Sequence, residues 1–231
     1  MKTRELDRMN AYYSEKLSSN NLKRCYDIAP PRVQEYLKSE MDFVLNHINS
    51  SDYTLELGCG YGRALKKLLS FSSEVIGIDI SYESLELTSE YIEESRRCHL
   101  IQASAEKLPI PDKSIDKLVC IQNGISAFKV DPQELILESV RVTKAGGVCL
   151  FSSYSPKFWE HRLNWFKMQS EEGLIGEIDW SKTSDGVIVC EDGFKASTFR
   201  PEDFLKLTNQ LDLEVTIREI DKSSIFCVIR V

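Results

Sequence analysis

Two segments of the chain carry residues whose types and spacing suit the binding of a small charged ligand. The first runs from Glu56 to Gly62 and reads Glu-Leu-Gly-Cys-Gly-Tyr-Gly. Alternate glycines let a backbone turn tightly and approach a ligand without Cβ interference. The second is Asp79, which follows Gly62 by 17 residues at the end of an apolar run. A carboxylate at a strand end can accept both hydroxyls of a ribose, so the two segments predict a nucleoside site.

The spacing of the glycines favours one kind of nucleoside. Dinucleotide sites use G-x-G-x-x-G, whereas this loop is G-x-G-x-G and is preceded by an acid, Glu56. A carboxylate at that point repels a pyrophosphate and attracts a cation. We therefore expect a ligand with an ammonium group and no phosphate.

Strands and helices alternate around these residues. Strands are expected at 53–57, 74–78, 98–102, 115–121 and 148–153, and helices at 63–70, at 81–94 and from Asp131 to the Gly146-Gly147 pair. This alternation predicts a Rossmann-like, doubly wound α/β fold with a mostly parallel sheet. Runs at 213–220 and 224–231 are joined by a short turn and should add an antiparallel hairpin, for seven strands in all.

The ends of the chain depart from that alternation. Helices are expected from Leu6 to Leu17, from Val33 to Ile48 and from about residue 200, and short β-like runs at 186–190 and 194–198 suggest a small insertion after the fifth strand.

Four segments resemble, in order and with matching spacing, the motifs of the class I S-adenosylmethionine-dependent methyltransferases. They are Glu56 to Gly62, Gly77 to Ser81, Ala103 to Asp116 and Glu138 to Gly147. The resemblance covers about residues 26–231. It implies S-adenosylmethionine as the cofactor and in-line transfer of its methyl group to a small-molecule acceptor.

The resemblance also implies roles for single residues. The backbone of Gly58, Cys59 and Gly60 would approach the methionine moiety, Asp79 would hold the ribose, and Ala105 would contact adenine. The other residues expected in the cofactor site are Glu56, Gly62, Ile80, Ser104, Glu106, Gln122 and Asn123. Ser104 stands where the family often has an acid, so weaker discrimination of adenine is expected.

The acceptor is expected between the N-terminal segment and the residues after strand five. The residues expected to contact the acceptor are Tyr26 in the N-terminal segment and Tyr154 and His161 in an aromatic-rich run after strand five. His161 is expected to have a surface or hydrogen-bonding role, with that of a general base as the alternative if the nucleophile arrives protonated; methyl transfer does not always need a base. The sequence leaves the acceptor atom open among N, O, S and C.

The whole chain is expected to form one methyltransferase domain. Its parts would be an N-terminal helical cap (1–50), a cofactor-binding core (51–155), an acceptor-side insertion (156–200) and a C-terminal helix and hairpin (201–231).

Other functions remain open at this point. A cofactor-binding or regulatory protein without turnover would keep the same cofactor motifs. An NAD-dependent dehydrogenase would need a Tyr-x-x-x-Lys pair near the cleft, and Tyr12 and Lys16 have that spacing but precede the whole sheet. An aminopropyltransferase would have more glycines and an aspartate in the loop.

The net charge of −7 comes almost entirely from one stretch. Residues 171–192 contain seven acids and one base, so the rest of the protein is nearly neutral. Such a chain lacks the basic face that nucleic acid requires. The acidic stretch could select acceptors by charge or simply be a solvated loop.

The cysteines and the apolar runs suggest a water-soluble protein in a reducing environment. Seven cysteines without a C-x-x-C pair are expected to be reduced and buried, with no metal site. No apolar run is long enough to span a membrane, and the charged start has no signal core. We therefore expect a cytoplasmic protein that contacts neither membrane nor nucleic acid.

Overall fold

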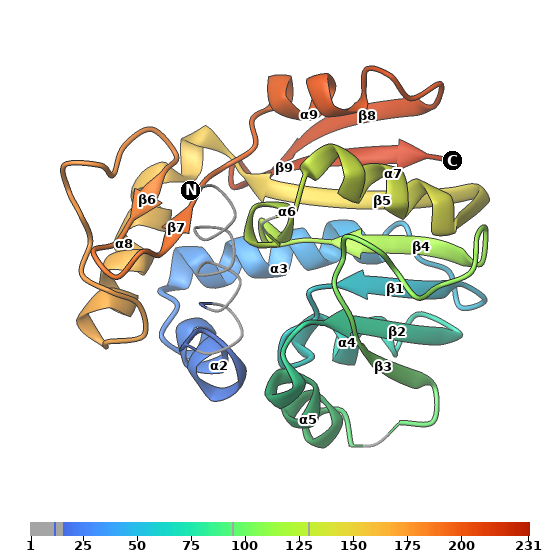
Figure 1. Ribbon diagram of the computed structural model, residues 1–231, viewed down its shortest axis with the longest axis horizontal. Helices are drawn as coiled ribbons and strands as arrows, with labels where there is room; N and C mark the ends of the chain where they lie inside the picture. The colour runs from blue at the N-terminus through green and yellow to red at the C-terminus, as the bar shows by residue number, and fades with distance from the viewer. Residues whose placement is uncertain (1–11, 13–15, 94, 129) are drawn as a thin grey trace.

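A seven-stranded sheet forms the centre of the computed structural model, which describes residues 12, 16–93, 95–128 and 130–231 (Figure 1). The strand order is β3-β2-β1-β4-β5-β9-β8. The strands are β1 (Tyr53–Leu57), β2 (Glu74–Asp79), β3 (Cys98–Gln102), β4 (Ile115–Cys120), β5 (Thr143–Tyr154), β8 (Glu214–Ile220) and β9 (Ser224–Arg230). β1 to β5 pair in parallel, and β9 runs antiparallel to β5 and β8. This confirms the predicted Rossmann-like sheet and its C-terminal hairpin.

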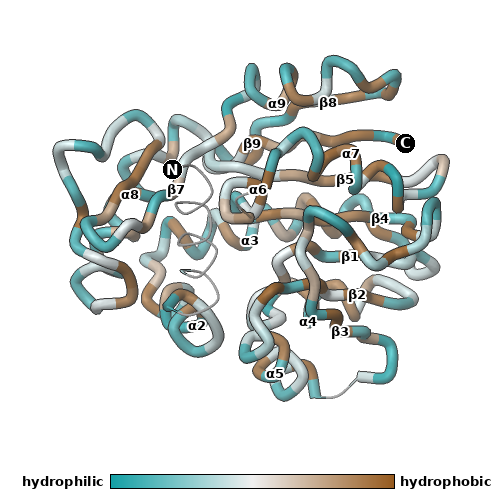
Figure 2. Tube along the Cα trace, in the orientation of Figure 1, coloured by the Kyte–Doolittle hydropathy of each residue, from teal (hydrophilic) through white to brown (hydrophobic). Residues whose placement is uncertain are grey.

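Helices cover both faces of the sheet. They are α2 (Ser19–Asp27), α3 (Pro31–Leu45), α4 (Arg63–Leu68), α5 (Tyr82–Tyr91), α6 (Gly124–Ala127), α7 (Pro132–Val142), α8 (Trp159–Glu171) and α9 (Pro201–Thr208), with a 3₁₀ turn, η2, at Pro156–Phe158. Side chains alternate along a strand, so Val119 packs in one core with α3, α4 and α5, while its neighbour Leu118 packs in another with α7 and α9. Figure 2 shows the apolar residues concentrated along the central strands.

A third apolar cluster lies beyond the carboxyl ends of the parallel strands. It joins Val33 and Tyr36 of α3 to Trp165 and Phe166 of α8 and to Phe194. The short strands β6 (Ile188–Val189) and β7 (Lys195–Ala196) pair antiparallel and confirm the small β-containing insertion. The insertion and α2 gather at the end of the molecule toward which β1, β4 and β5 point (Figure 1).

Two predicted helix starts are confirmed in detail. Ser81 caps α5 by accepting a hydrogen bond from the Ser84 amide, and Asp131 caps α7 by accepting one from the Gln133 amide. These side chains replace the partners that the first amides of a helix lack.

The prediction that the helix starting at Asp131 continues to the Gly146-Gly147 pair is wrong. α7 ends at Val142, and β5 already begins at Thr143. The glycine pair lies inside the strand because the Gly146 amide donates to the Val231 carbonyl at 2.6 Å, and the Val231 amide donates to the Gly147 carbonyl. Pairing with the end of the chain thus extends the strand through glycines that would otherwise favour a turn.

Helices α2 and α8 were not expected from the sequence. The apolar residues of α2 are Leu22, Cys25 and Tyr26, and a single turn of helical spacing in nine residues is too short to predict a helix. In α8 the buried positions include the polar Arg162 and Gln169, which hides the apolar face. Most of the helix expected from Leu6 to Leu17 lies outside the described residues.

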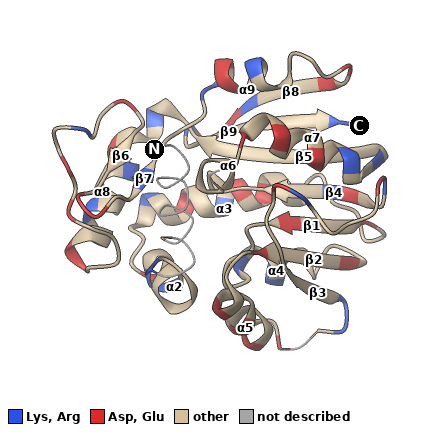
Figure 3. Ribbon diagram, in the orientation of Figure 1, with Lys and Arg blue, Asp and Glu red and all other residues tan. Residues whose placement is uncertain are grey.

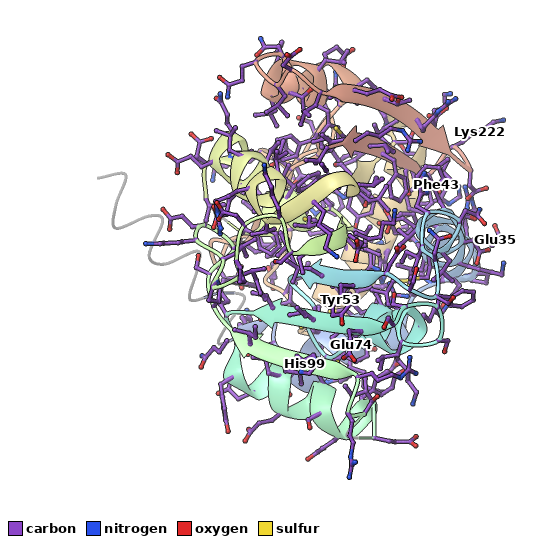
Figure 4. The ribbon with its side chains drawn as sticks, turned by 90° about the vertical axis from the view of Figure 1, so that its right-hand side faces the viewer. Glu35, Phe43, Tyr53, Glu74, His99 and Lys222 are labelled. Atoms are coloured by element: carbon purple, nitrogen blue, oxygen red, sulfur yellow. The ribbon has the colours of Figure 1, made fainter. Side chains whose placement is uncertain are left out.

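The amino ends of the strands form the opposite side of the molecule, shown in Figure 4, where Tyr53, Glu74 and His99 lie on three neighbouring strands. His99 Nε2 is 3.0 Å from the Glu74 carboxylate, an exposed pair at the sheet edge far from the insertion. In the described part of the chain, no helix is long and apolar enough to cross a membrane.

Candidate active site

The glycine loop turns from β1 into α4 with little room for side chains. Gly58 and Gly60 have φ of +69° and +54°, a backbone region that residues other than glycine rarely adopt. A Cβ on Gly58 would stand 2.7 Å from the Phe128 ring, and one on Gly60 would stand 2.7 Å from Leu22. Both positions therefore require glycine for their conformation, and a Cβ at either would also displace a neighbouring side chain.

Asp79, at the end of β2, holds the glycine loop through backbone amides. One carboxylate oxygen accepts the Gly60 amide at 2.8 Å, and the other accepts the Ser81 amide at 2.9 Å. Burial raises the pKa of Asp79, and these amides oppose the rise. Each oxygen keeps a second lone pair, so the carboxylate can still accept hydroxyl groups of a ligand.

A buried carboxyl group, Glu56, and a half-buried guanidinium, Arg63, lie beside the loop. Glu56 is 5% exposed, and burial raises its pKa to about 8 against the opposing effect of Arg63. Among the described residues, Glu56 Oε2 and Arg63 Nη2 have no hydrogen-bond partner. The Arg63 guanidinium lies 4.9 Å from the centre of the Tyr26 ring. Two such orphaned groups in one place are costly without a ligand that satisfies both.

A cavity of about 370 Å³ joins this region to the insertion. Its donor half, as we name it, contains the residues of the glycine loop and strand ends: Glu56, Gly58, Cys59, Gly60, Arg63, Asp79, Ile80, Ser104 and Ala105. Its acceptor half contains Tyr26, Tyr154, Trp165, Phe166, Gln169, Phe194 and Ala196. Gln122 and Asn123 line the cavity from the end of β4.

Gln122 and Asn123 adopt left-handed backbone conformations at the carboxyl end of β4, with φ of +56° and +62°. The Gln122 amide donates to Glu40 at 3.1 Å and to Ser152 at 2.9 Å, which holds the turn in place. The Gln122 side-chain oxygen accepts a 2.6 Å hydrogen bond from the Tyr26 hydroxyl. These contacts connect the turn to α3, β5 and α2.

Asn123 ties the core to the end of the insertion. Its side-chain amide donates to the Ser197 carbonyl at 2.8 Å, and its oxygen accepts from Ser153 at 2.7 Å. Ser153 in turn accepts the Phe199 amide. Both ends of the Asn123 side chain are thus used within the protein.

Polar contacts join the N-terminal segment to the insertion over the cavity. The Trp165 indole donates to the Cys25 carbonyl at 2.8 Å. Asp192 accepts from Tyr12 and pairs with Lys16, and Arg24 lies 3.1 Å from Glu172. These four contacts hold together two segments that are far apart in the sequence.

The acidic stretch lies on the outer turns of the insertion (Figure 3). Asp179 pairs with Lys182 and Asp185 with Arg200, in addition to the two pairs with the N-terminal segment. None of its acids lines the cavity.

The structure brings most of the predicted site residues together. Glu106 and Gly62 do not line the cavity, although Gly62 caps α4 and completes the turn. His161 is exposed on α8, where it packs against Phe158, and it does not reach the cavity either. The described residues contain no group of three or more His, Cys, Asp or Glu that could hold a metal ion.

Sequence reasoning missed Arg63, Glu40 and Gln169. For Arg63 a signal existed, because a cation in the first turn of a helix opposes the helix dipole and needs another reason to be there. Glu40 and Gln169 lie on helices whose other buried residues are mostly apolar, and nothing in the sequence separates them from surface positions.

Comparison with known proteins gives the same architecture. Residues 55–151 match the family described as a methyltransferase domain. A SAM-dependent methyltransferase from Aquifex aeolicus aligns with a TM-score of 0.61 at 13% identity, over 90% of this chain and 96% of that one. The DhpI–SAH complex aligns with a TM-score of 0.65 at 12% identity, over 97% and 96%. At these identities the structures show the fold alone.

One curated relative is more similar in sequence over a shorter region. The malonyl-[acyl-carrier protein] O-methyltransferase of Marinomonas sp. (strain MWYL1) is 34% identical over 128 residues, 54% of this chain and 47% of the relative. The chain spans about half the length of the curated relatives it matches.

The sheet order, the glycine loop and Asp79 together define a Rossmann-like fold of the class I methyltransferase type. Residues 55–151 are in addition similar in sequence to a methyltransferase domain.

Proposed function

We propose that the protein binds S-adenosylmethionine in the donor half and transfers its methyl group to a small-molecule acceptor in the acceptor half. One observation carries the proposal: the buried Glu56 and the half-buried Arg63 each have one buried polar atom without a partner among the described residues, and both line the same cavity as Asp79 and the glycine loop. A ligand with an ammonium, a carboxylate and a ribose satisfies all three side chains.

The residues present fit this cofactor. Glu56 would hold the ammonium and Arg63 the carboxylate of the methionine moiety, and Asp79 would hold the ribose hydroxyls. Gly58 and Gly60 would allow the backbone to approach the ligand. When bound, the cofactor supplies an electrophilic methyl group on a sulfonium.

The chain's own residues would act by positioning and by excluding water. Trp165, Phe166 and Phe194 form an apolar wall, and a sulfonium loses its charge during transfer, so a dry environment favours the reaction. The Tyr26–Gln122 hydrogen bond would fix the side of the cavity between the two halves. The described lining of the acceptor half contains neither a carboxylate nor an imidazole, and in this proposal it orients the nucleophile.

Two alternatives have less support. A dinucleotide would place its pyrophosphate near the buried Glu56, which repels it. A binding protein without turnover would use the donor half alone and would not explain why the cavity continues into an aromatic acceptor half.

The test compares ligands that differ only in the amino-acid moiety. Calorimetry should show that S-adenosylhomocysteine binds at least 100-fold more tightly than 5′-methylthioadenosine, and that NAD does not bind. In Glu56→Gln and Arg63→Met this preference should collapse, while affinity for methylthioadenosine stays within about twofold. Equal binding of both nucleosides by the unaltered protein would refute the assignment. Turnover to S-adenosylhomocysteine with an acceptor would separate an enzyme from a binding protein.

A further inference from the structure

The walls of the acceptor half are aromatic. The ring centres of Tyr26 and Trp165 are 5.8 Å apart, those of Trp165 and Phe166 are 5.9 Å apart, and those of Phe166 and Phe194 are 5.9 Å apart. Tyr154 adds a buried ring from the end of β5. Such a wall offers flat apolar surfaces against which a planar molecule can stack.

The described residues of the acceptor half carry no formal charge. Within the described residues that line the whole cavity, the charged ones are Glu56, Arg63 and Asp79, and all three belong to the donor half. Arg162 packs against the Tyr154 ring at 4.5 Å, but its guanidinium donates to the Gly186 and Ala196 carbonyls and lines a separate, smaller cavity. An anionic acceptor would therefore be buried here without a partner of opposite charge, and a cationic one would have only the faces of the aromatic rings to replace its hydration.

Gln169 is the exception to the apolar character of this wall. It is only 3% exposed and lines the cavity from α8. No hydrogen bond to its side-chain amide is seen among the described residues. Its amide atoms are not among the buried polar atoms that lack a partner, so they face the open space of the cavity, where a ligand can reach them.

We propose that the acceptor is an uncharged, planar molecule that stacks on the aromatic wall and hydrogen-bonds to the side-chain amide of Gln169. This inference rests on the proposed function and specifies the acceptor that the site selects. Gln169 has two donors and one carbonyl acceptor, so it can recognise a hydroxyl, a ring nitrogen or a carbonyl group on such a molecule.

Three probes with the same aromatic body test the charge. 2-Naphthol is neutral, 2-naphthoate is an anion, and 2-naphthylmethylamine is a cation at neutral pH. Each is titrated by calorimetry into the protein saturated with S-adenosylhomocysteine. We expect naphthol to bind at least tenfold more tightly than either charged probe. Equal or tighter binding of naphthoate would instead indicate that Arg63 binds an anionic acceptor. A lack of naphthol binding would refute the proposal that the acceptor is uncharged and planar.

Gln169→Leu tests the hydrogen bond. It should weaken naphthol binding three- to tenfold, the range for one neutral hydrogen bond, and leave S-adenosylhomocysteine affinity unchanged. The matched control is Gln210→Leu, an exposed position beyond α9, which should alter neither. Unchanged naphthol binding in Gln169→Leu would refute the role of Gln169. The two proposals fail in different measurements. If the unaltered protein does not bind S-adenosylhomocysteine, the proposed function is refuted; the naphthalene probes test only the class of acceptor.

Discussion

Glu56→Gln should stabilise the ligand-free protein and at the same time weaken cofactor binding. The reason is that the Glu56 carboxylate is 5% exposed and lacks a protein partner for Oε2, so its ionisation is unfavourable until a cation arrives. Glutamine has nearly the same shape without the charge.

The size of the gain follows from the pKa. Burial raises the pKa of Glu56 from 4.5 to about 8, so the folded protein holds a proton that the unfolded chain has released between these values. Stability is therefore lost as the pH rises above 4.5, and the loss is complete above about pH 8. At pH 7 it amounts to about 3 kcal/mol, and Glu56→Gln avoids it. For a chain of this size that corresponds to a rise in Tm of about 6 °C or more.

The assay is thermal unfolding from pH 5 to pH 9 together with calorimetric titration of S-adenosylhomocysteine. The Tm advantage of Glu56→Gln should be small at pH 5 and grow up to about pH 8. Binding should weaken by at least about 30-fold, because the ligand's ammonium loses its buried partner. Glu86→Gln, at an exposed position in the middle of α5, is the control and should change neither quantity. A Glu56→Gln variant that is less stable than the parent at pH 8 would refute the reasoning.

Three further predictions concern the same cavity. Gly60→Val should abolish most cofactor binding in calorimetry, because a Cβ at this position would stand 2.7 Å from Leu22. Gly173→Val is the control and should bind the cofactor normally, because Gly173 has a similar φ but open space around it. Equal loss of binding in both variants would indicate that backbone strain alone is the cause. Asp79→Ala should weaken S-adenosylhomocysteine binding more than 100-fold and Asp79→Asn less, since the amide keeps one of the two oxygens that hold the Gly60 and Ser81 amides; unchanged affinity in Asp79→Ala would remove it from the site. Replacing Glu177, Asp179 and Asp185 by Gln or Asn should change acceptor affinity less than twofold, because none of them lines the cavity; a larger change would show that their charge selects the acceptor.

Apart from β5, which begins five residues before its expected start, the strands of the large sheet could be predicted to within one residue. Most of the donor half could be predicted as well, with Arg63 as the exception. β1 and β3 match the expected ranges because turns and polar residues on both sides of a short apolar run define where the strand begins and ends. The glycine spacing and Asp79 likewise lie in one continuous segment, where sequence distance reflects spatial distance.

The acceptor half could not be predicted in the same way. Its walls come from α2, α8 and β7, and their side chains meet only after the chain has folded back on itself. His161 illustrates the difficulty, since it is close in sequence to Trp165 and Phe166 yet faces away from the cavity they line. Helical direction, rather than proximity in sequence, decides which of these residues face the ligand.

The indole–carbonyl hydrogen bond between Trp165 and Cys25 bears on how this domain could be redesigned. It joins residues that are 140 positions apart, and each belongs to a different wall of the same cavity. A mutant library confined to residues 156–200 would vary one wall and leave the other fixed, so many of its members would lose packing against α2. Changing the acceptor would therefore call for paired libraries, in which α2 and α8 are randomised together and selected as one unit.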